Sequence, residues 1–179
     1  MRRIDMGLHQ GESERFLIEI GEQSAAAWLK RLESGDAKIE TRLTQLYGED
    51  SETRESRKML MLRAVNTFVR AYGPDRNIIV SRAPGRINLL GNHIDHRGGY
   101  VNYVCISRDT VLVASSNQDD TVRIANANAE RFHPAEFSIS ALLPADRRGN
   151  WNEYIEHADV TAGSWGNYIR APLLCRSAQ

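Results

Sequence analysis

Residues 12–72 carry apolar residues at helical spacing, three or four positions apart. Gly35 interrupts this pattern, so we expect a first helix to end there. A second helix is predicted over about 37–47, and a third begins with Ser51 as its expected N-cap. Gly73-Pro74 closes the third helix, because neither residue continues a helix well. The first part of the chain is therefore predicted to be helical.

From Asn77 onward the chain changes to short runs of β-branched and aromatic residues, which are typical of strands. Pro84-Gly85 predicts a bend that ends one strand before the next begins. Asp119-Asp120 predicts a hairpin turn between two later strands. The predicted strands cover 78–80, 86–90, 100–106, 110–114, 121–125 and 132–139.

After a loop at 144–150, residues 151–174 return to helical character, with a break near Gly163. A helical beginning, a strand-rich block and a final helix indicate an α+β fold rather than alternating α and β units. We expect two parts, a helical N-terminal segment over 1–72 and a second part over 73–179.

Composition excludes several classes of protein. The 179 residues are 41% hydrophobic and 26% charged, which is typical of a globular domain and not of a disordered chain. The net charge is zero, with 23 basic and 23 acidic side chains, so we expect no nucleic-acid partner. No apolar run reaches the ~20 residues that a membrane helix needs, and no signal peptide is recognisable. Cys105 and Cys175 lie far apart, and Cys105 reads as a core residue, so we expect a reducing cytoplasm.

Residues 82–100 concentrate polar chemistry between two apolar runs. In the strand after the expected bend, Arg86 and Asn88 should share one face, while Ile87 and Leu89 face the core. A fixed arginine suits a transferring phosphoryl group, and short polar side chains suit the hydroxyls of a sugar. The loop after the strand carries Asn92, His93, Asp95 and His96, between Gly91 and the turn at Gly98-Gly99.

The residues of this loop also allow two other readings. Arg86 can pair with Asp95 as a structural ion pair, with His93 an ordinary loop histidine. His93, Asp95 and His96 also have the spacing of metal ligands. Metal hydrolases with such a pair usually place another histidine two residues earlier, where this chain has Gly91. We therefore expect no metal site.

The sequence from Arg82 to Tyr100 resembles the galactokinase signature of the GHMP kinase superfamily. That signature reads Ala-Pro-Gly-Arg-x-Asn-Leu-Ile-Gly-Glu-His-x-Asp-Tyr-x-x-Gly. Weaker likeness extends to about 38–174 and includes Tyr47-Gly48 and Trp165–Ile169. The resemblance implies a GHMP-kinase-like N-terminal domain over 73–179, a mixed sheet packed with helices, preceded by a helical extension. It also implies an ATP-dependent sugar 1-kinase that uses Mg²⁺.

The resemblance also implies roles for single residues. Arg86 matches the arginine that assists phosphoryl transfer, and His93 and Asp95 match contacts to sugar hydroxyls. Gly98 or Gly99 matches a turn glycine. Asn92 stands where most galactokinases have a sugar-binding glutamate, and His96 replaces a tyrosine, so both are expected at the sugar. Galactose is the leading substrate, and a related hexose or uronic acid is an alternative.

The family's phosphate loop, Pro-x-Gly-x-Gly-Leu-Ser-Ser-Ser, does not occur among the 179 residues. The nearest imitation, Thr161–Gly166, is expected to be a turn before a helix. We therefore expect a truncated kinase in which absent residues bind most of the ATP and Mg²⁺, so that this chain alone has little activity. The alternative is a non-catalytic sugar-binding module or a decayed kinase fragment. The oligomeric state is not predicted.

Overall fold

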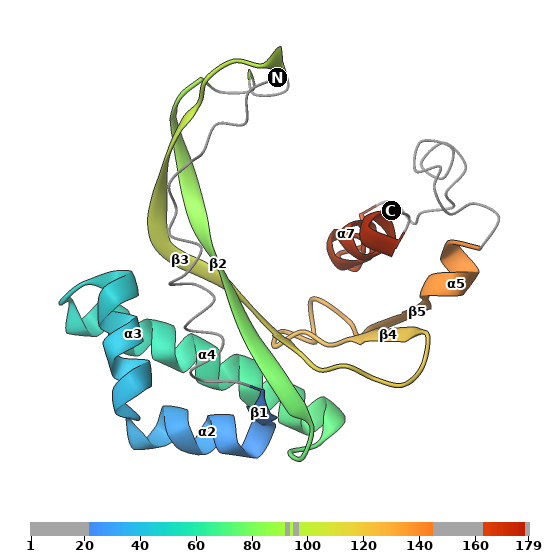
Figure 1. The fold of residues 1–179 in the computed structure, drawn as a ribbon, viewed down its shortest axis with the longest axis horizontal. Coiled ribbons are helices and arrows are strands. Elements are labelled where there is room, and N and C mark those ends of the chain that lie inside the picture. The colour runs from blue at the N-terminus through green and yellow to red at the C-terminus, as the bar shows by residue number, and fades with distance from the viewer. Residues whose placement is uncertain (1–21, 92–93, 95–96, 145–162, 178–179) are drawn as a thin grey trace. The chain divides into compact units, whose positions relative to one another are not determined.

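The computed structural model describes residues 22–91, 94, 97–144 and 163–177 (Figure 1). The chain divides into two compact units between Ser115 and Ser116, and each unit has its own sheet. Helices combine with antiparallel strands, so the predicted α+β class is confirmed. Every strand pair among the described residues is antiparallel, and the mixed sheet of a GHMP-like domain stays a prediction.

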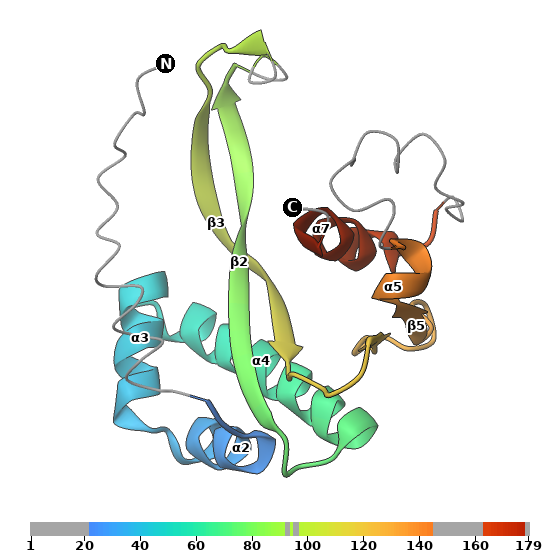
Figure 2. The same cartoon turned by 45° about the vertical axis from the view of Figure 1, so that its right-hand side comes forward.

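The first unit packs helices against a long two-stranded ribbon (Figure 2). The predicted helical character is confirmed from Ala25 onward, and residues 12–21 lie outside the described residues. Its elements are β1 (Gln23–Ser24), α2 (Ala25–Ser34), α3 (Ala37–Tyr47), α4 (Ser51–Tyr72), β2 (Asn77–Leu90) and β3 (Asn102–Ala114).

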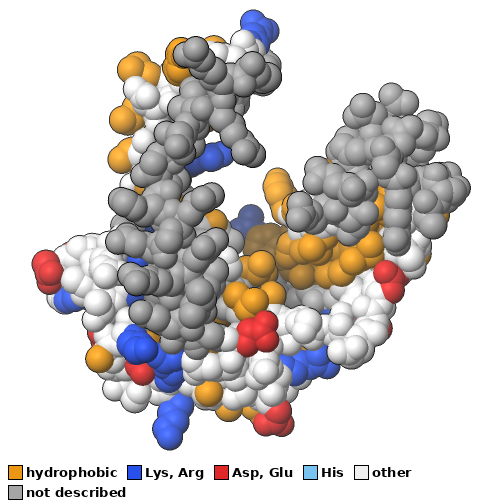
Figure 3. All heavy atoms as spheres, viewed as in Figure 1, with side chains coloured by type: hydrophobic (Ala, Val, Ile, Leu, Met, Phe, Trp, Pro, Cys, Tyr) orange, Lys and Arg blue, Asp and Glu red, His pale blue; other side chains and the backbone are white. Residues whose placement is uncertain are grey.

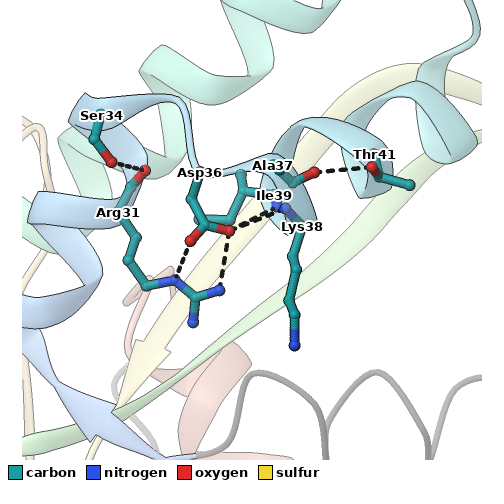
Figure 4. A network of polar contacts seen from close by, with 7 residues as sticks. All are labelled: Arg31, Ser34, Asp36, Ala37, Lys38, Ile39 and Thr41. Carbon is teal, nitrogen blue, oxygen red and sulfur yellow. Dashed lines mark hydrogen bonds and ion pairs between the residues drawn. The ribbon is translucent and has the colours of Figure 1, made fainter.

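One carboxylate holds the turn between α2 and α3 (Figure 4). Asp36 caps α3 by accepting hydrogen bonds from Lys38 N at 3.0 Å and Ile39 N at 3.3 Å. It also accepts from Nε and Nη2 of Arg31, both at 3.0 Å. The hydrogen bond from Arg31 is the main cause that holds the pKa of Asp36 below its usual value. Gly35 precedes the cap with φ 67°, a left-handed conformation that glycine adopts without strain, so the predicted end of the first helix is confirmed.

The N-cap of α4 is Asp50 and not Ser51, so the predicted cap was wrong by one residue. The Asp50 carboxylate accepts a hydrogen bond from Thr53 N at 3.3 Å, which leaves Ser51 as the first helical residue. The physical reason is that an aspartate in this position reaches the free N–H groups of the first turn as well as serine does.

The core of the first unit joins the helices to the base of the ribbon. Val65 and Phe68 of α4 are buried together with Ile78 of β2. The domain boundary expected between residues 72 and 73 therefore falls inside this unit, and the division of the chain into domains stays a prediction. The buried core residues are Ala25, Trp28, Leu32, Ile39, Leu43, Val65, Phe68 and Ile78.

The predicted bend at Pro84-Gly85 does not end a strand, because β2 continues through it for 14 residues. The pairing register shifts there instead. Pro84 pairs with Asp109, whereas Gly85 pairs with Ile106, so β3 contributes two extra residues. A Cβ at Gly85 would lie 2.9 Å from the carbonyl oxygen of Arg108, which is too close. This bulge therefore requires glycine at position 85.

A buried carboxylate ties α3 to the ribbon beside this register shift. The side chain of Asp109 is only 1% exposed, and its Oδ1 accepts a hydrogen bond from Nε of Arg82 at 3.1 Å and forms an ion pair with Nη2 of Arg82 at 3.0 Å. The Tyr47 hydroxyl donates to Oδ2 of the same carboxylate. The Arg82 guanidinium also lies over the Tyr47 ring, 5.1 Å from its centroid. These three side chains, the Asp109 cluster, lock one helix and two strands together.

Among its described residues, 116–144 and 163–177, the second unit has a strand pair and two helices, and the predicted hairpin turn at Asp119-Asp120 was wrong. β4 pairs with β5 and not with β3. Asp119 instead accepts a hydrogen bond from Thr121 N at 2.8 Å, which caps the start of β4. Residues 151–162 of the predicted final helix lie outside the described residues. The elements are β4 (Thr121–Ile124), β5 (Ala135–Ser138), α5 (Ile139–Leu142) and α7 (Asn167–Ser177).

Cys105, expected in the core, is exposed on β3, because it lies beyond the part of the ribbon that the helices cover. No helix in the described ranges combines the length and apolar character needed to cross a membrane.

The Asp109 cluster predicts a dependence of stability on alkaline pH. Burial, followed by the hydrogen bond to Asp109, raises the pKa of Tyr47 from 10.0 to about 12. The folded state therefore keeps this proton longer than the unfolded state. The protonated Tyr47 hydroxyl therefore stabilises the folded state fully below pH 10, and this stabilisation is lost as the pH rises through 12.

We expect Tyr47→Phe to lower the free energy of unfolding by about 1–2 kcal/mol at pH 7, because one hydrogen bond to a carboxylate is lost. Urea denaturation at several pH values measures this loss, and the difference between wild type and variant should shrink between pH 10 and 12. Tyr100→Phe, at an exposed tyrosine, is the control and should change neither value. A difference that stays constant over this pH range would contradict the assignment.

Candidate functional site

The structure describes two of the predicted site residues. Arg86 lies on β2 and Gly98 lies in the turn that leads back toward β3. Asn92, His93, Asp95 and His96 lie outside the described residues. The Arg86–Asp95 ion pair and the metal-ligand set therefore stay untested. In the ranges that the structure describes, no group of three His, Cys, Asp or Glu side chains is placed to hold a metal ion.

Arg86 occupies a short regular ladder between two register shifts. Residues 85–88 pair in continuous register with 103–106. The first shift precedes this ladder at Pro84/Gly85, and the second follows it, where Leu90 pairs with Asn102. Bulges of this kind twist a ribbon and change the direction of its side chains. The side chains of this ladder, including Arg86, are therefore expected to point in a different direction from those before the first shift.

The guanidinium of Arg86 contacts an aromatic ring on the neighbouring strand. Arg86 is exposed, and its Cζ lies 4.9 Å from the centroid of the Tyr103 ring. Arg86 itself pairs with Cys105, and Tyr103 pairs with Asn88, so the contact is a diagonal one across the ladder. A cation over a ring at this distance is attracted by the ring's quadrupole. The contact gives Arg86 a defined partner at the surface.

Asn88 shares the face of Arg86, as predicted, since the two residues lie two apart in a regular ladder. With its amide turned to satisfy its neighbours, Asn88 donates to Leu90 O at 2.7 Å and to Asn102 O at 3.1 Å. These bonds bridge the two strands at the second register shift. Asn88 therefore stabilises the bulge that ends the ladder.

Ile87 and Leu89 do not face a core, contrary to the prediction. They are 50% and 63% exposed. The helices bury the ribbon only near its base, around Ile78, and no described element of the first unit covers Ile87 or Leu89. Figure 3 shows hydrophobic side chains reaching the surface along this ribbon. The alternation of residue types correctly predicted which side chains share a face of the strand, but it wrongly predicted that one face is buried.

The two ends of the loop after β2 meet at a glycine. Gly91 has φ 80°, and a Cβ there would lie 2.4 Å from the carbonyl oxygen of Tyr100. The carbonyl oxygen of Ile94 accepts a hydrogen bond from Gly99 N at 2.9 Å, and Gly98 between them has φ 77°. The predicted turn at Gly98 is confirmed. The loop thus leaves and rejoins the ribbon at one place, directly after the ladder that carries Arg86.

Tyr103 was not predicted as a neighbour of Arg86. Its residue type indicated only a strand over 100–106. The signal lies in the pairing register, which the two shifts alter and which no local pattern reveals. The same holds for Asp109, whose partners Arg82 and Tyr47 are 27 and 62 residues away in sequence.

The ribbon that carries Arg86 lies within a stretch that matches a known family pattern. A family pattern described as the galactokinase galactose-binding signature matches residues 66–116, from the second half of α4 through the whole ribbon. The galactokinase of Dictyostelium discoideum is 33% identical over 94 residues, which are 50% of this chain and 19% of that protein. The galactokinase of Candida parapsilosis is 32% identical over 113 residues, which are 63% of this chain and 20% of that protein.

A bacterial relative agrees with these two. The galactokinase of Clostridium perfringens strain 13 is 35% identical over 91 residues, which are 51% of this chain and 23% of that protein. No solved structure matches this chain. The chain spans about a fifth of the length of the relatives it matches. With its galactose-binding signature on β2, β3 and the loop between them, the chain is related to the galactokinases and corresponds to an N-terminal portion of that family.

Proposed function

We propose that the chain is the sugar-recognising portion of an ATP-dependent sugar 1-kinase. The complete enzyme would transfer the γ-phosphate of ATP to the anomeric hydroxyl of galactose or a related sugar. One observation carries the proposal: Arg86 is exposed on a strand ladder that leads straight into the loop of the galactose-binding signature. The arginine is followed within ten residues by the polar side chains that we propose to bind the sugar hydroxyls.

Arg86 is proposed to meet the transferring phosphoryl group. A guanidinium offers planar N–H donors that match the oxygens of a phosphate, and its charge stabilises the charge spread over them. Its position on a strand favours this role, because catalysis of phosphoryl transfer depends mainly on placement. The regular ladder between the two register shifts supports this role, because it gives Arg86 a fixed backbone position.

The loop is proposed to bind the sugar. The Asp95 carboxylate would accept hydrogen bonds from hydroxyl groups, and His93 can donate or accept. Asn92 brings an amide in place of a charged acceptor, and His96 adds a second imidazole. Gly98 would set the turn that closes the loop. Because Asn92 lacks the charge of the usual glutamate and His96 replaces the usual tyrosine, we propose galactose or a related hexose or uronic acid as the substrate.

ATP with Mg²⁺ would supply the transferable phosphoryl group in the complete enzyme. We assign no described residue of this chain to either, since the sequence lacks the glycine- and serine-rich loop expected to hold the nucleotide phosphates. We further propose a helical segment over 1–72, a partial GHMP-kinase-like domain over 73–179, and a cytoplasmic location.

The first prediction concerns activity. Purified chain incubated with ATP, Mg²⁺ and a panel of hexoses should form no detectable sugar 1-phosphate, because the nucleotide-binding loop is missing from its sequence. Chromatographic detection of the product measures this, with an intact galactokinase as positive control. Sustained formation of galactose 1-phosphate would show that the 179 residues suffice for catalysis.

The second prediction concerns sugar binding. Galactose should raise the melting temperature of the wild-type chain, because it binds only the folded state. Asp95→Ala should weaken galactose binding by about tenfold or more in calorimetric titrations, through the loss of a charged hydrogen-bond acceptor. Asp75→Ala removes an identical charge from an exposed turn before β2 and should have no effect.

Equal galactose affinity in the wild type and the Asp95→Ala variant would remove Asp95 from the sugar site. No galactose binding by the wild type at all would count against the sugar-recognition proposal itself.

The third prediction separates the two proposed roles. Arg86→Ala should weaken binding of galactose 1-phosphate by about tenfold or more while leaving galactose binding within about twofold. The reason is that, of the two parts of the ligand, Arg86 is proposed to contact the phosphoryl group and not the sugar. Arg108→Ala removes an exposed arginine from the same ribbon and controls for the loss of net charge. If Arg86→Ala weakens both ligands equally, Arg86 supports the loop rather than the phosphoryl group.

A further inference from the structure

Tyr103 has an interaction that its residue type alone does not account for. Its ring lies 4.9 Å from Cζ of Arg86, measured to the ring centroid, and 42% of the residue is exposed. Tyr103 is not a member of the apolar core of the first unit, which ends near the base of the ribbon. A large aromatic residue held at the surface against a cation calls for an explanation other than core packing.

The contact depends on the local register. Tyr103 pairs with Asn88, and Arg86 lies two residues before Asn88 on the same face of β2. Side chains in such diagonal positions are far enough apart that only long or aromatic residues meet. Arginine and tyrosine both have that reach. The second register shift comes directly after the Asn88–Tyr103 pair, so this pair is the last of the regular ladder.

The kind of contact also matters. A free arginine side chain samples many rotamers, and a partner that reduces this freedom prepares it for a ligand. An acidic partner would do so by occupying the N–H donors and cancelling the charge. An aromatic ring attracts the cation without supplying an oxygen acceptor, so both the charge and the hydrogen-bonding capacity stay available for an anion.

We propose that Tyr103 is a positioning residue that holds the Arg86 guanidinium on the ladder and leaves its donors for an incoming phosphoryl group. This inference rests on the proposed function, in which Arg86 meets that group. It adds a residue from the second strand to a site otherwise composed of β2 and the loop after it.

The test uses the whole chain and inorganic phosphate as the probe. The Nε–Hε resonance of Arg86 in a ¹H–¹⁵N NMR spectrum reports both on the ring and on the anion, and Arg86→Ala assigns it. Phosphate is titrated into the wild type, Tyr103→Leu and Tyr103→Phe. Tyr100→Leu, which removes an 87% exposed tyrosine three residues before Tyr103, is the matched control.

We expect phosphate to shift the Arg86 resonance in the wild type. Tyr103→Leu should abolish the ring-current shift of that resonance and weaken phosphate binding by about threefold, the effect of an exposed cation–π contact. Tyr103→Phe keeps the ring and should match the wild type within error, as should Tyr100→Leu. Wild-type phosphate binding by Tyr103→Phe, together with weaker binding by Tyr103→Leu, would show that the ring itself holds Arg86.

The inference is overturned if Tyr103→Leu binds phosphate as well as the wild type, or if phosphate leaves the Arg86 resonance unmoved. It is also overturned if Tyr103→Phe behaves like Tyr103→Leu, since the ring would then not be the holding group. A parallel titration with galactose tests the proposed function separately. Absent galactose binding with a Tyr103-dependent phosphate response contradicts the sugar site alone, and the reverse result contradicts only the positioning role.

Discussion

The buried carboxylate of Asp109 is the contact on which the geometry of the first unit depends. It accepts hydrogen bonds from Arg82 on the facing strand and from Tyr47 at the end of α3. A carboxylate that is only 1% exposed is costly unless its charge is paired and its oxygens are bonded. Removing Arg82 or Tyr47 would therefore leave the Asp109 carboxylate with an unsatisfied oxygen in a buried position. They fix the ribbon against the helices beside the position where the strand register shifts.

The register shift at Pro84/Gly85 affects the direction of the side chains that follow it on β2. The ladder over 85–88 lies between two bulges, and Gly85 permits the first because Arg108 O would collide with any Cβ. Arg86 and Tyr103 meet within this ladder, and the loop of the galactose-binding signature follows directly. The helical core and the Asp109 cluster hold the base of the ribbon, and the two register shifts then define the short ladder on which Arg86 lies.

Much of the local structure was predictable from sequence, because its causes are local. Helical periodicity and the glycine at position 35 determine where the first helix ends, and the Arg82–Tyr100 signature identifies the family and Arg86 as a candidate. Errors arose where two local signals competed or where a partner was needed. Asp50 caps α4 one residue before the expected Ser51, and a Pro-Gly step that usually turns a chain became a bulge within one strand.

The sequence by itself determined the helices of the first unit from Ala25 onward, most strand-forming runs, the α+β class and the residue types of the candidate site. Each of these follows from propensities and periods within a few neighbouring residues. Only the tertiary structure decided that Ile87 and Leu89 are exposed, that Asp109 binds Tyr47 and that Tyr103 meets Arg86. Burial and register are properties of how distant segments pair, and a two-residue shift in one strand changes every cross-strand neighbour after it without changing any local pattern.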